Sequence, residues 1–196
     1  MSYAIYKTDA IVMRTIPHGE ASTDVVFFTR DMGKVLVRAQ SARKPESKMR
    51  MHLTRYGLVS VDMVRGRAVW RLTGVSPVRR SGVFGSGLFL VPVHRTMRLA
   101  EFLIQGEDAH PDLFDFFVGL LSYAEEASLV RAPAKDEADG LELFGVIKVL
   151  EKLGYWNGPE FPDAPSPEAL VRCAADRKSL VKLINESISM TQIVVS

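Results

Sequence analysis

The stretch YGLVSVDMVRGRAVWRLTGV, residues 56–75, decides how the N-terminal half of this sequence folds. It contains two runs rich in β-branched and aromatic residues, joined by the polar tip RGR. In the second run alternate residues fall on opposite faces, and one face carries Ala68, Trp70 and Leu72. A period of two is typical of a strand with one buried face, so the stretch predicts two strands joined by a hairpin turn.

Three more runs of the same kind precede this hairpin and complete a β domain. They are YAIYKTDAIVMRT at 3–15, TDVVFFT at 23–29 and KVLVRAQ at 34–40. The turn DMGK before the third run places Gly33 where a tight turn favours a positive φ. Five strands at short spacing, with no helix between them, indicate a small barrel or sandwich.

From residue 88 onward the apolar residues repeat with a helical period. We expect helices within 88–106, 110–127, 135–154, 166–176 and 177–194. Local signals mark their ends, because Pro92 and Pro111 suit first turns and Gly154 stops the third helix. Ser166 or Asp176 is expected to cap the last two helices.

This change of period predicts an α+β protein with two domains. The β domain covers residues 1–80, a glycine-rich hinge covers 81–87, and an all-α domain covers 88–196. Both parts are of ordinary domain size.

The composition excludes several classes of protein. The chain of 196 residues is 47% hydrophobic and 24% charged, and charges break its apolar runs well before the roughly 18 residues of a membrane span. Lys7, Asp9 and Arg14 interrupt the first apolar stretch, so we expect no signal peptide and no membrane insertion. The single cysteine, Cys173, excludes an intrachain disulfide and a cysteine-built zinc site, and it fits a reducing cytoplasm.

A search for catalytic motifs finds none. The sequence has no phosphate-binding loop G-x-x-x-x-G-K-[ST], no H-E-x-x-H and no G-x-S-x-G. The histidines lie singly, without the short spacings of metal ligands, so we expect no metal and no cofactor. His18, Glu20 and Asp24 could supply an acid and a base, but a turn between strands explains them as well. We therefore expect a protein that is not an enzyme.

The charge is divided unevenly along the chain. Residues 1–80 hold 15 Lys and Arg against 6 Asp and Glu, a net charge of +9, whereas residues 81–196 carry a net charge of −7. Between Lys34 and Arg55 there are seven basic residues and one acid. Cations that merely solubilise strand edges explain a few lysines, but they explain poorly a local excess made mainly of arginine. This excess favours binding to a polyanion such as a nucleic acid.

The candidate DNA-binding residues are the cations of the β domain together with one aromatic residue. Small barrels bind single strands with a basic groove and with aromatic rings that stack on bases. Among Tyr3, Tyr6, Phe27, Phe28, Tyr56 and Trp70, we expect Trp70 to be buried and only one of the two phenylalanines to face inwards. The predicted site consists of Arg14, Lys34, Arg38, Arg43, Lys44, Lys48, Arg50, Arg55, Tyr56, Arg65 and Arg67.

The first 75 or so residues resemble the opening domain of RecO, a bacterial family of recombination mediator and DNA-repair proteins. The resemblance lies in AIVMRTIPHGEAS at 10–22, in FFTRDMGKVLVRAQSARKP at 27–45, in L-x-x-Y-x-L-V at 53–59, and in the RGR turn. It implies an OB-fold barrel followed by a helical bundle. Some members carry a four-cysteine zinc module, and this sequence has only Cys173 at that place, so the resemblance implies no metal here.

The resemblance also implies a function and partners. The family binds single- and double-stranded DNA, anneals complementary strands, and with RecR helps to load the RecA recombinase in the bacterial cytoplasm, at the nucleoid. Some members bind the acidic C-terminal tail of the single-stranded DNA-binding protein SSB through the helical part, where Arg95, Arg98, Arg172 and Lys178 are the available cations. Two alternatives stay open: an OB-like adaptor that binds proteins without significant DNA affinity, and a nuclease or transferase that uses His18, Glu20 and Asp24.

Overall fold

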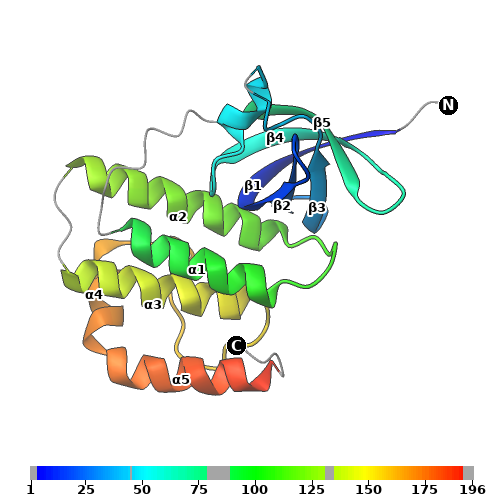
Figure 1. Ribbon diagram of the computed structural model, residues 1–196. Helices are drawn as coiled ribbons and strands as arrows, with labels where there is room; N and C mark the ends of the chain where they lie inside the picture. Colours follow the sequence, from blue (N-terminus) through cyan, green and yellow to red (C-terminus); the bar gives the residue numbers. More distant parts are fainter. Residues whose placement is uncertain (1–3, 45, 79–88, 131–134, 192–196) are drawn as a thin grey trace. The chain divides into compact units, whose positions relative to one another are not determined.

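The protein is described here from a computed structural model, which covers residues 4–44, 46–78, 89–130 and 135–191 (Figure 1). The chain forms two compact units. The barrel unit contains Met1–Ser81 and Ile104–Phe114, and the helical unit contains Gly82–Leu103 and Asp115–Ser196. The predicted hinge at 81–87 lies outside the described residues.

The barrel unit is a closed barrel of five strands, as the sequence predicts. The strands are β1 (Ile5–His18), β2 (Ser22–Thr29), β3 (Gly33–Ala39), β4 (Leu58–Val64) and β5 (Trp70–Pro77). They close in the order β1-β2-β3-β5-β4, with β3 and β5 parallel and every other pair antiparallel. Five strands closed into a small barrel, with helices following in the chain, confirm the predicted OB-fold and the α+β class.

The alternation of side chains along the strands fills the barrel. Val25 and Phe27 of β2 face Val37 and Val35 of β3 across the ladder, and all four are buried in one apolar cluster. Trp70 is 4% exposed and belongs to the same cluster, which confirms its predicted burial. Ala68 does not follow the predicted pattern: it is exposed, because the strand begins only at Trp70 and Ala68 lies in the preceding loop.

A segment between two helices belongs to the barrel unit, although the sequence pattern places it in the helical domain. Residues 104–114 supply Glu107, whose Oε1 accepts a hydrogen bond from Trp70 Nε1 at 3.0 Å. The backbone oxygen of Gly106 accepts a hydrogen bond from Lys34 N at 3.2 Å. Phe28 points away from the barrel core and packs against Phe114, with ring centroids 5.9 Å apart. These contacts cover an outer face of the barrel that would otherwise expose a phenylalanine.

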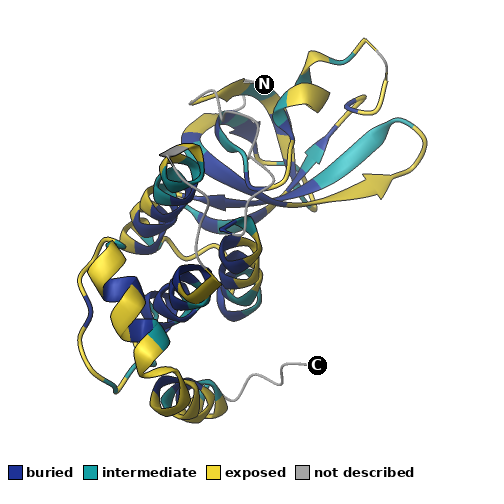
Figure 2. Ribbon diagram, turned by 90° about the vertical axis from the view of Figure 1, so that its left-hand side faces the viewer, coloured by how far each residue is buried: buried dark blue, intermediate teal, exposed yellow. Residues whose placement is uncertain are grey.

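The helical unit is built around one central helix. Its helices are α1 (Leu90–Leu103), α2 (Pro111–Val130, whose first turn lies in the barrel unit), α3 (Lys135–Lys152), α4 (Pro167–Ala175) and α5 (Arg177–Met190). Eleven of the 18 residues of α3 are buried, and α3 packs against α1, α4 and α5. Figure 2 shows the contrast between the largely buried α3 and the largely exposed α5. No helix in the described part of the chain is both long and apolar enough to span a membrane.

The predicted ends of the helices are largely confirmed. Pro92 lies in the first turn of α1, and α2 begins at Pro111. Gly154 has a φ of +79° just after α3. Ser166 caps α4, because its hydroxyl accepts a hydrogen bond from Ala169 N at 3.3 Å, whereas the side chain of Asp176 makes no such bond to α5.

We expect Gly33→Ala to destabilise the barrel more than Gly19→Ala does. Both glycines have a positive φ, +65° and +58°, so alanine at either position costs about 1–2 kcal/mol of backbone strain. A Cβ at Gly33 would also overlap the backbone of Asp108, whereas at Gly19 nothing lies within 4 Å. Urea denaturation of the two variants measures the difference. Equal losses of unfolding free energy would contradict this packing of residues 104–114.

The thiol of Cys173 should be unreactive in the folded protein. Cys173 is fully buried, and burial raises the pKa of its thiol to about 12. Because the thiolate is the reactive form, we expect no labelling by Ellman's reagent at neutral pH until denaturant unfolds the helical unit. One equivalent should then react, and rapid labelling of the native protein would show that α4 does not pack as described.

Candidate nucleic-acid interface

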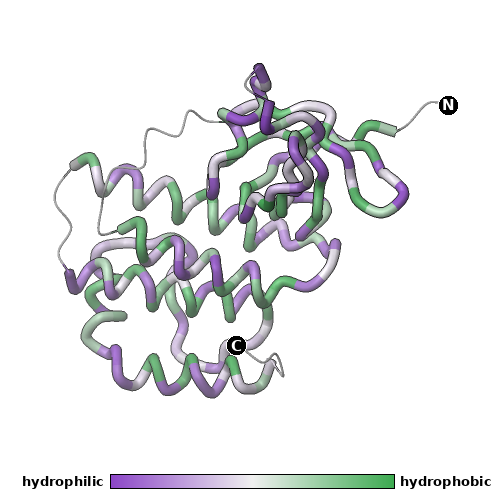
Figure 3. The backbone as a smooth tube through the Cα atoms, viewed as in Figure 1, coloured by the Kyte–Doolittle hydropathy of each residue, from purple (hydrophilic) through white to green (hydrophobic). Residues whose placement is uncertain are grey.

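The chain between β3 and β4 carries most of the predicted basic residues. This basic segment, residues 40–57, contains the 3-10 helix η1 (Lys48–His52), and Figure 3 colours much of it as hydrophilic. Its apolar residues Ala42 and Leu53 are buried in the barrel core, at 2% and 9% exposure, and Met49 packs against the same cluster. The segment is therefore attached to the barrel on both sides of η1.

Backbone hydrogen bonds fix the first part of the basic segment. Arg43 N donates to the carbonyl oxygen of Ala21 at 2.9 Å, in the turn between β1 and β2. Ser41 adopts a φ of +57°, and Lys44 N donates back to its carbonyl oxygen at 3.1 Å. The Arg43 guanidinium donates to the carbonyl oxygen of Gly19 at 2.9 Å. The segment thus lies beside the β1–β2 turn, with its charged side chains in solvent.

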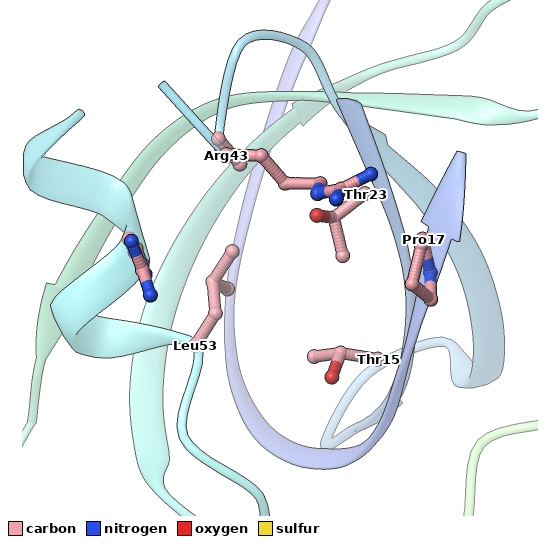
Figure 4. A pocket seen from close by; sticks show the side chains of 7 residues that line it. Thr15, Pro17, Thr23, Arg43 and Leu53 are labelled. Atoms are coloured by element: carbon pink, nitrogen blue, oxygen red, sulfur yellow. The ribbon is translucent and has the colours of Figure 1, made fainter. Parts of the chain in front are cut away.

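A cavity of about 360 Å³ lies between the basic segment and the ends of β1 and β2. Its lining residues are Thr15, Pro17, Thr23, Ala42, Arg43, Arg50 and Leu53. Figure 4 shows Arg43 reaching across Thr23 toward Pro17, with Leu53 and Thr15 on other sides of the opening. We call this space the barrel-mouth cavity, because Ala42 and Leu53 in its wall also belong to the barrel core.

Four of the predicted cations have side chains that are available for a ligand. They are exposed, and within the described part of the chain they have neither a hydrogen-bond partner nor an ion-pair partner: Lys44, Lys48, Arg50 and Arg67. The first three belong to the basic segment, and Arg67 lies in the loop between β4 and β5. When a surface cation has no protein partner, replacing its bound water by a phosphate costs little free energy, because no protein contact is broken. These four residues are therefore the strongest candidates for contacts with a polyanion.

Three of the other predicted cations are already engaged within the barrel unit. Arg38 donates two hydrogen bonds to Asp24, at 2.8 and 3.0 Å. Arg55 Nε donates to the carbonyl oxygen of Met13 at 3.1 Å. Arg65 lies 3.8 Å from a carboxylate oxygen of Glu107, and its guanidinium carbon lies 5.2 Å from the ring centroid of Trp70.

The last two predicted cations lie on separate strands, away from the basic segment in sequence. Arg14 is exposed on β1, beside the bulge that follows Val12. Lys34 is half-buried at the start of β3. The structure therefore places Lys44, Lys48 and Arg50 together on the basic segment, and it places Arg14 on the strand that Arg55 of this segment contacts at Met13.

The expectation that Tyr56 stacks on bases is wrong. Tyr56 is only 2% exposed, so its ring is packed within the barrel unit and a base cannot reach it. Its backbone N–H donates to the carbonyl oxygen of Val12 at 2.6 Å. Arg55 lies 4.9 Å from the ring centroid, over one face. Among the aromatic candidates in the described part of the chain, Tyr6 has an accessible ring: it is 44% exposed and touches Trp70 edge-on, with ring centroids 5.1 Å apart. Tyr6 lies near the start of β1, where the row of inward-facing residues reaches the edge of the barrel.

The phenylalanine pair behaves as the strand pattern predicts. Phe27 lies in the barrel core, and Phe28 faces outwards but is covered by Phe114. Neither ring is exposed, so neither is available for stacking. Tyr3 lies outside the described residues.

The groups considered for catalysis form a structural contact. His18 Nδ1 lies 3.2 Å from Asp24 Oδ2, and both oxygens of that carboxylate accept hydrogen bonds from Arg38. These hydrogen bonds hold the pKa of Asp24 below its ordinary value, and the charges of Arg38 and His18 lower it further. Glu20 is exposed in the neighbouring turn. In the ranges that the structure covers, no three His, Cys, Asp or Glu residues gather as metal ligands would.

The four cations named for the helical unit lie on three helices of its described part, α1, α4 and α5. Arg95 donates to Glu142 at 2.9 Å, and Arg172 lies over the ring of Phe161 at 4.8 Å from its centroid. Arg98 and Lys178 are exposed on α1 and α5.

Comparison with known proteins gives one consistent result. A family model described as "Recombination protein O N terminal" matches residues 1–80. The chain is 32% identical over 156 residues to the DNA repair protein RecO of Aromatoleum aromaticum, a match that covers 76% of this chain and 58% of that protein. It is 27% identical over 151 residues to the RecO of Dehalococcoides mccartyi strain 195, covering 76% of this chain and 56% of the relative. The chain thus spans little more than half the length of these relatives.

We expect the Asp24–Arg38 contact to make stability depend on acidic pH. Since the pKa of Asp24 is lower in the folded than in the unfolded protein, its contribution is complete above about pH 4 and is lost as the pH falls toward the folded value. Asp24→Asn removes this contribution, so the wild type should exceed the variant in urea midpoint at pH 7, and the gap should shrink at pH 3. A gap that stays constant between the two pH values would contradict the account.

Proposed function

Because the chain belongs to the RecO family, we propose that it is a DNA-binding protein of recombinational repair that holds single- and double-stranded DNA on its barrel unit and anneals complementary strands. The observation that carries this proposal is a group of three cations beside the barrel-mouth cavity, Lys44, Lys48 and Arg50, whose side chains have no partner among the described residues. The names of the relatives, each a DNA repair protein, support the same role.

The proposed mechanism needs no chemical step. Each cation that meets a phosphate releases condensed counterions, and this release is the main source of affinity. A strand whose charge is partly neutralised along the basic segment repels a second strand less, so a complementary strand can approach and pair. The segment is suited to this task because Ala42 and Leu53 attach it to the core while its charged side chains stay in solvent.

Further parts of the proposal concern the cell and the partners. We place the protein in the bacterial cytoplasm, at the nucleoid, where with RecR it helps to load RecA on DNA. A contact with the acidic tail of SSB would use the helical unit, where the exposed Arg98 and Lys178 are the cations to test first. Arg95 is less suited, because Glu142 already pairs with it.

The salt dependence of binding to a labelled oligothymidine tests the DNA contact. If Lys44, Lys48, Arg50 and Arg67 each meet one phosphate, the log–log slope of affinity against salt should be about −3. The triple variant Lys44→Gln/Lys48→Gln/Arg50→Gln should flatten this slope by about 2 and weaken binding at low salt. Fluorescence anisotropy across a salt series measures both quantities.

The control removes equal charge from the helical unit. The variant Arg98→Gln/Lys178→Gln/Lys182→Gln has the same net charge as the first triple variant, and its affinity should stay close to that of the wild type. Equal losses in both variants would mean that net charge alone attracts DNA and that the basic segment has no special role. Wild-type binding that is weak and indifferent to salt would favour a protein-binding adaptor instead.

A further inference from the structure

The barrel-mouth cavity continues the inside of the barrel beyond its apolar core. Thr15 pairs with Val25, and Thr23 pairs with Ala39, two residues that face the core. Thr15 on β1 and Thr23 on β2 therefore continue the inward-facing side chains of these strands to the open end of the barrel, where polar side chains replace apolar ones. Thr15, Thr23 and the buried Ala42 and Leu53 line one continuous space.

The polar groups of this cavity have hydrogen-bonding capacity to spare. Within the described ranges of the chain the hydroxyls of Thr15 and Thr23 have no hydrogen-bond partner, and neither does the guanidinium of Arg50. Arg43 donates from one terminal nitrogen to Gly19, and this leaves its other N–H groups for a ligand. The cavity thus offers two hydroxyls that can donate or accept and two forks of N–H donors.

The remaining wall is apolar and suits the flat face of a ring. Pro17 and Leu53 lie on different sides of the opening in Figure 4. A volume of about 360 Å³ is near the lower end of ligand cavities, so it suits one small group and excludes a duplex. A group with a flat apolar face, hydrogen-bonding edges and an attached anion matches these walls.

We propose that the barrel-mouth cavity binds one unpaired nucleotide of the DNA strand held by the basic segment. Its phosphate lies between Arg43 and Arg50, its base lies against Pro17 and Leu53, and the hydroxyls of Thr15 and Thr23 meet the edge of the base. This inference rests on the proposed DNA binding and adds a preference to it. A base in a duplex must first leave its stack and its pair, at a cost in free energy, so the cavity favours single strands.

Replacement of the two hydroxyls by methyl groups tests the cavity without changing charge or size. We expect Thr15→Val/Thr23→Val to weaken binding of a labelled oligothymidine about five- to tenfold, because two hydrogen bonds are lost. Binding of a fully paired hairpin duplex should change less than twofold. The control Thr73→Val alters an exposed threonine of β5, outside both the cavity and the basic segment, and should leave both affinities unchanged.

A second pair of variants keeps the test independent of packing at the barrel mouth. Arg50 and Lys48 are both exposed on η1, but only Arg50 lines the cavity. Arg50→Gln should lower the ratio of single-strand to duplex affinity, whereas Lys48→Gln should weaken both affinities equally. Identical effects of the two substitutions on this ratio would overturn the inference.

The outcomes separate this inference from the function on which it rests. If the wild-type protein showed no salt-dependent binding to DNA, both the proposed function and the nucleotide site would be overturned. Normal binding with a single-strand preference that the double valine variant leaves intact would overturn only the cavity. If inorganic phosphate displaced the labelled oligothymidine as effectively as thymidine 5′-monophosphate does, the cavity would bind only the anion and not the base. An unlabelled DNA strand should displace the labelled oligothymidine at a lower nucleotide concentration than free thymidine 5′-monophosphate does. Equal displacement at equal nucleotide concentration would contradict a site for a nucleotide within DNA.

Discussion

The order of strands in the barrel decides where the positive charge of this protein lies. β5 stands between β3 and β4 in the barrel wall, so the chain cannot pass from β3 to β4 through a tight hairpin. It passes instead along the barrel mouth, where Ala42 and Leu53 insert into the core at either side of η1. Their burial fixes a segment that would otherwise be a free basic loop, and it holds Lys44, Lys48 and Arg50 in solvent beside a cavity.

The arginines of the barrel divide into two groups with different physical roles. Arg38 donates hydrogen bonds to Asp24, and Arg55 donates to the carbonyl oxygen of Met13. These two arginines therefore help to hold strands and turns in place. Arg50 and Arg67 have no partner within the described part of the chain and keep their full capacity for phosphate. A charge count treats all of these residues alike. The division matters because an N–H group that already donates to the protein must break that bond before it can bind an anion.

Local rules predict much of this fold, and long-range contacts account for what they miss. The positive φ of Gly33, the start of α2 at Pro111 and the cap at Ser166 depend on a few neighbouring residues, so the sequence predicts them. Tyr56 is buried where its backbone N–H donates to Val12 of β1, a residue more than 40 positions away in the sequence. The attachment of residues 104–114 to the barrel and the cavity beside η1 likewise depend on tertiary packing, which periodicity does not encode.

The central claim is that DNA lies along the barrel mouth, and crosslinking locates the strand most directly. A single strand containing 5-bromouracil would be irradiated with the wild-type protein, and the attached peptides would be identified by mass spectrometry. The account predicts crosslinks in residues 40–57 and in the neighbouring ends of β1 and β2, with fewer at high salt. Crosslinks confined to α1–α5 would contradict it and would place the DNA surface on the helical unit.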